Sequence, residues 1–128
     1  MLPCIVIGDS IAVGIAQDLT ECRSQAYAGI SASNFDKLYH TISPELTIIS
    51  LGSNPGPEDL THLRHLRNKI TNKVIWLLPP ARIRDIVKEV AAEHNDLIID
   101  VLLSDATSRH IHPNRKGYAH LANLIRNK

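Results

Sequence analysis

The sequence predicts a three-layer α/β/α domain with a five-stranded, mostly parallel sheet. Short apolar runs alternate with amphipathic segments along the whole chain, and no repeat or Pro/Gly-rich linker interrupts them. Such an alternation is typical of parallel strands joined by right-handed crossovers, with helices on both faces of the sheet. The length of 128 residues is that of one ordinary domain. We therefore expect a single domain that spans residues 1–128.

The strands are expected where Ile, Val and Leu gather between polar or turn residues. Four such runs occupy residues 4–7, 46–51, 74–78 and 97–102. Their nearly continuous apolar character indicates strands that are covered on both faces. Residues 24–28 are a weaker candidate for a fifth strand.

The helices are expected between and after these strands. Apolar residues recur at three- and four-residue spacing in residues 11–19, 33–42, 58–70 and 83–94, as they do in amphipathic helices. A fifth helix is expected over residues 114–125, with Asn114 as its N-cap. Five strand–helix units use almost the whole chain, so little of it remains for a lid, and we expect a shallow, open site.

Composition excludes several classes of protein. A net charge of +1 argues against a dedicated binder of nucleic acid or of an anionic membrane. The first residues have neither the basic start of a signal peptide nor a run long enough to span a membrane, so we expect a cytoplasmic protein. Cys4 lies in an apolar run, which favours a buried free thiol over a disulfide with Cys22.

Residues that can do chemistry follow the expected strands. Active sites in parallel sheets lie at the carboxyl ends of the strands, where the strand order reverses. Gly8-Asp9-Ser10 follows the first strand, where the serine amide at a helix start would favour a developing negative charge. Gly29 follows the second, and Gly52-Ser53-Asn54 offers a side-chain amide after the third. Taken singly, these segments are more often helix caps and turns than catalytic groups.

The last segment of this kind is His112-Pro113-Asn114, which is followed by Gly117-Tyr118. Taken in order, the four blocks resemble those of the SGNH superfamily, also called GDSL-type esterases and lipases, over nearly the whole chain. The resemblance implies a flavodoxin-like SGNH hydrolase fold. It also implies a serine esterase that acts on small, acetyl-like acyl esters of small molecules or glycans.

The same resemblance implies a role for each matching residue. Ser10 would be the nucleophile and His112 its general base. The amides of Ser10 and Gly29 and the side-chain amide of Asn54 would form the oxyanion hole. No cofactor is implied. His110, His112 and His120 lack a carboxylate or thiolate partner at ligand spacing, so we expect no metal.

One position departs from the family pattern. The family places an aspartate three residues before the histidine, and Arg109 stands there instead. Three explanations remain open: Asp105 supplies the acid, a backbone carbonyl orients His112 in a Ser–His dyad, or catalysis is weak or lost. Asp100 is expected to be a structural hydrogen-bonding group rather than the missing acid.

Other interpretations also remain open. A non-catalytic SGNH-like module could bind a ligand or a partner protein at the same rim, and Arg109 favours this alternative. A nucleotide-binding flavodoxin-like domain has less support, because the chain lacks a glycine-rich dinucleotide fingerprint. Arg115 and Lys116 beside Arg109 form either an anion-recognising rim or an ordinary charged loop. His62 and His65 share a helix face that we expect to be solvated. The sequence leaves the oligomeric state open.

Overall fold

The sheet has the predicted parallel architecture. The computed structural model describes residues 4–40, 45–52, 54, 56, 58–79, 83–101 and 112–128. In these residues the strands β1 (Cys4–Gly8), β2 (Arg23–Ala26), β3 (Leu46–Ser50), β4 (Val74–Leu78) and β5 (Leu97–Asp100) form one sheet in the order β2-β1-β3-β4-β5. Every neighbouring pair is parallel. The strand order reverses at β1, which lies between β2 and β3.

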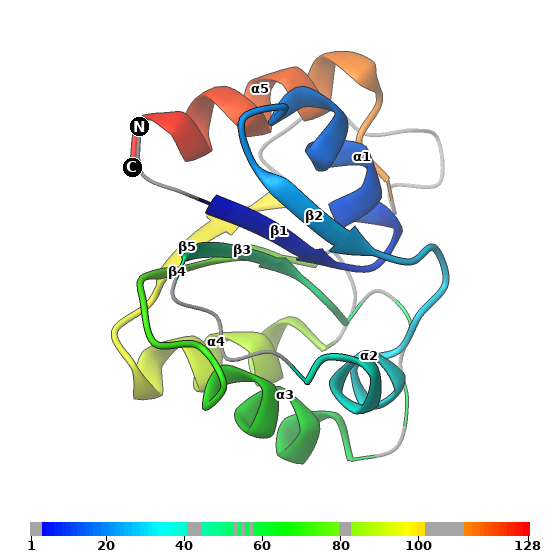
Figure 1. The fold of residues 1–128 in the computed structure, drawn as a ribbon, viewed down its shortest axis with the longest axis vertical. Coiled ribbons are helices and arrows are strands. Elements are labelled where there is room, and N and C mark those ends of the chain that lie inside the picture. Colours follow the sequence, from blue (N-terminus) through cyan, green and yellow to red (C-terminus); the bar gives the residue numbers. More distant parts are fainter. Residues whose placement is uncertain are drawn as a thin grey trace.

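Helices cover both faces, as predicted (Figure 1). Helices α1 (Ser10–Asp18) and α5 (Arg115–Arg126) lie on one face; α2 (Ala32–Leu38), α3 (Asp59–Arg67) and α4 (Arg84–Glu93) lie on the other. The predicted helix over residues 33–42 is too long, since α2 ends at Leu38. Its last turn is capped from outside, because Lys69 Nζ donates to the carbonyl oxygens of Asp36 and Tyr39. Residues 41 and 42 lie outside the described residues.

Each face of the sheet carries its own apolar core. Phe35, Tyr39 and Trp76 are fully buried between the sheet and α2, α3 and α4. Ile11 and Ile15 of α1 pack with Leu121 of α5 on the opposite face. All five residues of β1 and of β4 are buried, as expected for strands covered on both sides.

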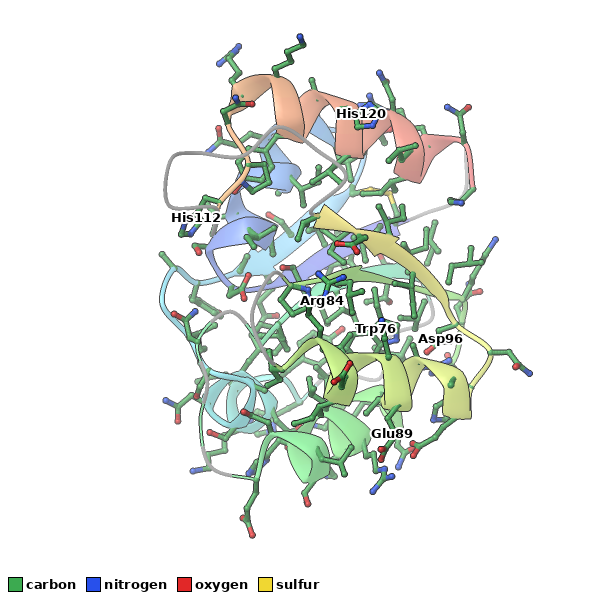
Figure 2. All side chains as sticks on the ribbon, turned by 180° about the vertical axis from the view of Figure 1, so that it is seen from behind. Trp76, Arg84, Glu89, Asp96, His112 and His120 are labelled. Carbon is green, nitrogen blue, oxygen red and sulfur yellow. A yellow bond between two sulfur atoms is a disulfide. The ribbon has the colours of Figure 1, made fainter. Side chains whose placement is uncertain are left out.

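A buried ion pair ties the outer helices to the sheet. Arg67 at the end of α3 contacts Asp96 through Nε, at 2.7 Å from Oδ2. The indole Nε1 of Trp76 donates to the same oxygen at 2.9 Å, and Figure 2 labels both Trp76 and Asp96. The pair therefore joins α3, β4 and the turn that precedes β5.

The prediction of a free thiol at Cys4 is wrong. Cys4 and Cys22 form a disulfide, with their Cα atoms 4.7 Å apart. The cause is the register of β1 and β2, in which Ile5 lies opposite Arg23. The residues immediately before them, Cys4 and Cys22, are therefore brought side by side at the start of both strands. An apolar environment is compatible with a disulfide as well as with a free thiol. The register between two strands, which decides the pairing here, cannot be inferred from the sequence of either strand alone.

The described residues contain neither a membrane-spanning helix nor a metal site. None of their helices is long and apolar enough to cross a membrane. Within the same residues, no group of three or more His, Cys, Asp or Glu side chains has an arrangement that could hold a metal ion.

Candidate active site

Ser10 and His112 meet at the carboxyl ends of the strands. Ser10 is the first residue of α1, directly beyond β1, and His112 lies just before α5. The Oγ of Ser10 and the Nε2 of His112 are 2.6 Å apart and form a hydrogen bond. His112 lies at the entrance to the orange helix α5 in Figure 2. A serine hydroxyl with a base at this distance is the arrangement that nucleophilic catalysis needs.

Asp9 holds the turn that carries Ser10. Its buried carboxylate caps α1, and Oδ1 accepts hydrogen bonds from the backbone N of Ile11 at 3.1 Å and from Ser50 Oγ at 3.0 Å. The Asp9 backbone N also donates to Ser50 O at 2.9 Å. Asp9 thus caps α1 and braces the turn that carries Ser10. It fastens the end of β1 to the end of β3.

Ser50 was missed by sequence reasoning. Ser50 is a polar residue at the end of a buried apolar strand, and a buried hydroxyl needs a hydrogen-bond partner. This feature of the sequence could have indicated its contact with Asp9. The contact is also tight along the backbone: a Cβ on Gly8 would lie 1.9 Å from the carbonyl oxygen of Ser50. Gly8 has a φ of 137°, which favours glycine. The turn that carries Ser10 is therefore in close contact with β3.

The loops that carry Gly29 and Asn54 come together at the same end of the sheet. Tyr27 N donates to Gly8 O at 2.9 Å, so the chain after β2 leaves beside the turn of Ser10. Gly29 follows with a φ of 79°, and a Cβ there would meet open space. Asn54 Nδ2 donates to Ile30 O at 3.2 Å and so joins its own loop to that of Gly29.

The structure does not place the candidate acid. Asp105 and Arg109, together with His110 and Ser53, lie outside the described residues. Among the residues that are described, His112 hydrogen-bonds Ser10 and no carboxylate.

Asp100 has the structural role predicted for it. It forms an ion pair with Arg84, whose Nη1 donates to Asp100 Oδ1 at 3.0 Å and to Pro79 O at 2.9 Å. Figure 2 shows Arg84 in the helix layer on the opposite side of the sheet from α5. Asp100 thus holds the ends of β4 and β5 against α4.

The helix face of His62 and His65 is only partly solvated, contrary to expectation. Both rings hydrogen-bond the carboxylate of Asp36 on α2 through Nδ1, at 3.0 and 2.8 Å, and Lys69 Nζ lies 3.0 Å from Asp36 Oδ1. The side chain of His65 is 65% exposed, but that of His62 only 21%. Sequence spacing placed the two rings on one face, but only packing of α2 on α3 could bring them to Asp36.

Comparisons with known proteins reveal similarity of structure. No protein-family model matches the sequence, and no curated protein matches it. Several solved structures are similar over 99% of this chain. Three of them are a carbohydrate acetylesterase from Sinorhizobium meliloti (13% identity, 97% of that chain, TM-score 0.72), the M. smegmatis aryl esterase (13%, 99%, 0.64) and a protein of the G-D-S-L family from Desulfitobacterium hafniense (18%, 99%, 0.66).

These identities are low, so the similarity concerns the fold. The five parallel strands, the helices on both faces and the coverage of nearly the whole of each chain agree with the resemblance drawn from the four sequence blocks. This chain has the three-layer α/β/α fold of the SGNH/GDSL-type esterases and acylhydrolases.

Proposed function

We propose that this protein is a serine esterase that hydrolyses small, acetyl-like acyl esters, with Ser10 as nucleophile and His112 as general base. The observation that carries the proposal is the 2.6 Å contact between Ser10 Oγ and His112 Nε2. It lies where the strand order reverses, which is where parallel α/β folds bind ligands. The neighbours in structure are esterases and acylhydrolases, which supports a hydrolase.

The reaction proceeds in two acyl transfers. Ser10 Oγ bonds to the ester carbonyl carbon while its proton passes to His112 Nε2. The carbon–oxygen bond to the alcohol then breaks, and His112 gives the proton to the departing oxygen. A water molecule then attacks the acyl carbon while His112 accepts its proton. The bond between Ser10 Oγ and the acyl carbon breaks, His112 returns the proton to Oγ, and the carboxylic acid is released.

The oxyanion hole consists of three donors: the backbone N–H of Ser10, that of Gly29 and the side-chain amide of Asn54. The backbone donor of Ser10 lies at the start of α1, where N–H groups are free of helical partners. Asn54 uses one amide hydrogen on Ile30 O and has a second for the substrate oxygen. Each such donor contributes about 3 kcal/mol of transition-state stabilisation.

The substrate is a small-molecule or carbohydrate ester with a short acyl group. The connections after β1, α1 and β2 are short, and we expect little covering for a long acyl chain. Acetyl or butyryl esters should be turned over faster than long-chain esters. A preference for long chains, measured on a series of aryl esters, would contradict this substrate class.

Ser10→Ala tests the nucleophile. The wild-type protein should hydrolyse an aryl acetate and react with a fluorophosphonate probe, and Ser10→Ala should lose both reactions. The matched control is Ser33→Ala, which removes a hydroxyl from α2 and should retain both. Full activity of Ser10→Ala would reject the assignment.

A second pair of variants identifies what orients His112. His112→Ala should abolish turnover. Asp105→Ala should lower kcat by up to about 10⁴-fold if this carboxylate holds the imidazole. An unchanged kcat in Asp105→Ala beside an inactive His112→Ala would instead favour a Ser–His dyad.

The second candidate function is a non-catalytic binding module that uses the same pocket. The observation in its favour is Arg109, a cation where the family has its acid. The fluorophosphonate experiment separates the two, because an unactivated Ser10 would remain unlabelled.

A further inference from the structure

A groove of about 380 Å³ lies between α1 and α5. Its walls are Gly14, Gln17 and Asp18 of α1 and Arg115 and Tyr118 of α5. The volume falls within the range of small-molecule sites, about 300–1,000 Å³. Figure 1 shows the two helices side by side on the same face of the sheet. None of these residues has a part in the proposed chemical steps.

The groove begins one helical turn from the nucleophile. Ser10, Gly14 and Gln17 are spaced i, i+4 and i+7 along α1, so they share one stripe of that helix. Four residues of helix rise about 6 Å. On the other wall, Arg115 follows His112 by three residues, and Tyr118 lies one turn further along α5. A substrate that reaches from Ser10 along this stripe enters the groove.

Gly14 and Tyr118 shape the floor of the groove. A Cβ at Gly14 would lie 2.2 Å from Tyr118 Cζ, so the tyrosine ring rests directly on the α1 backbone. Burial, with a smaller contribution from the Asp9 carboxylate, raises the pKa of Tyr118 to about 12. The phenol therefore stays protonated at any ordinary pH.

The groups around the groove are suited to hydroxyls. The Asp18 carboxylate accepts hydrogen bonds, whereas the Arg115 guanidinium and the Gln17 amide donate them. One positive and one negative side chain face the same space, so the formal charge of the walls is zero. An anion would be attracted by Arg115 but repelled by Asp18, and the walls are about as apolar as they are polar, with the Tyr118 ring among them. A neutral polyhydroxyl ligand matches both kinds of group.

We propose that this α1–α5 groove binds the sugar of a carbohydrate acyl ester, the alcohol that is released when Ser10 is acylated. This inference rests on the proposed esterase function and adds a leaving-group subsite to it. Arg115 and Gln17 are its specificity-determining residues. Both are exposed in the structure and so can be reached by a ligand.

The first test measures selectivity. The kcat/KM for a monoacetylated xylo-oligosaccharide is divided by that for 4-nitrophenyl acetate, which has no sugar. Arg115→Ala should lower this ratio about tenfold or more, because it removes a hydrogen bond from a charged donor. The matched control is Lys116→Ala, which removes the neighbouring exposed charge of the same helix and should leave the ratio unchanged. An unchanged ratio in Arg115→Ala, or an equal fall in both variants, overturns the subsite.

The second test does not need activity. Ser10→Ala protein titrated with a xylo-oligosaccharide should bind it, and the additional change Gln17→Trp, which fills the groove, should weaken binding at least tenfold. Binding that is indifferent to Gln17→Trp overturns the groove even if the wild type is an esterase. Conversely, groove-dependent binding by a protein with no esterase activity supports the groove and rejects the proposed function.

Discussion

Gly8 is a residue whose position in the fold leaves no room for a side chain. Its φ is 137°, and the space where a side chain would begin is filled by the backbone of Ser50. Gly29 also has a positive φ, but open space surrounds it. A comparison of the two glycines therefore distinguishes the cost of a steric clash from the cost of placing a side chain at a positive φ.

We expect Gly8→Ala to destabilise the protein by about 3 kcal/mol or more, since backbone strain and a clash with a strand combine. Gly29→Ala is the control and should cost about 1–2 kcal/mol, the penalty for a side chain in the left-handed region. Urea unfolding of both variants measures the difference. Equal costs at the two positions would contradict the close approach of β1 and β3.

At the scale of elements, the contact between α2 and α3 depends on a carboxylate. Burial opposes ionisation of Asp36, but hydrogen bonds from His62, His65 and Lys69 outweigh it and hold the Asp36 pKa below its ordinary value of 3.8. A carboxyl whose pKa is lowered by folding stabilises the folded state when it is ionised. This stability is fully present above about pH 4 and is lost as the pH falls through the pKa of the folded state.

Asp36→Asn should therefore lower the free energy of unfolding by about 2 kcal/mol at pH 7, where hydrogen bonds to a charged group are lost. The difference from wild type should shrink as the pH falls below 4. Urea unfolding at pH 7 and pH 3 measures both values. Asp85→Asn, a change at an exposed position of α4, should alter stability by less than about 0.5 kcal/mol at pH 7. A loss in Asp36→Asn that is equally large at pH 3 would contradict the role of the ionised carboxylate.

At the scale of the whole molecule, the disulfide closes the chain from the first residue of β1 to the residue before β2. The two cysteines are 18 positions apart. Closing a loop of this size removes freedom from the unfolded chain and stabilises the fold by about 3 kcal/mol. The crosslink holds the edge strand β2 at the end of the sheet opposite Ser10.

The double variant Cys4→Ala/Cys22→Ala should therefore unfold with a free energy about 3 kcal/mol lower than the oxidised wild type. Reduction of the wild type by dithiothreitol should bring its stability close to that of the variant, whereas the variant should not respond to the reductant. Indifference of the wild type to dithiothreitol, measured by thermal unfolding, would show that the crosslink contributes little.

The apolar runs and helical spacings were sufficient to predict the fold class. A strand that is buried on both faces is apolar throughout, and a helix that is buried on one face has apolar residues at three- and four-residue spacing. The order of the four sequence blocks likewise predicted that Ser10, Gly29, Asn54 and His112 lie at one end of the sheet. Helix ends were less predictable. The early end of α2 depends on Lys69, which lies 31 positions beyond Leu38 in the sequence and meets α2 only after packing.

The sequence by itself determined the alternation of strands and helices and the strand ends at which polar residues gather. These properties are local, because each depends on residues that are close together in the sequence. Only the tertiary structure decided the pairing of Cys4 with Cys22, the bracing of Asp9 by Ser50, the gathering of His62 and His65 on Asp36, and the groove between α1 and α5. Each of these depends on register or packing between segments far apart in the chain, which no single segment records.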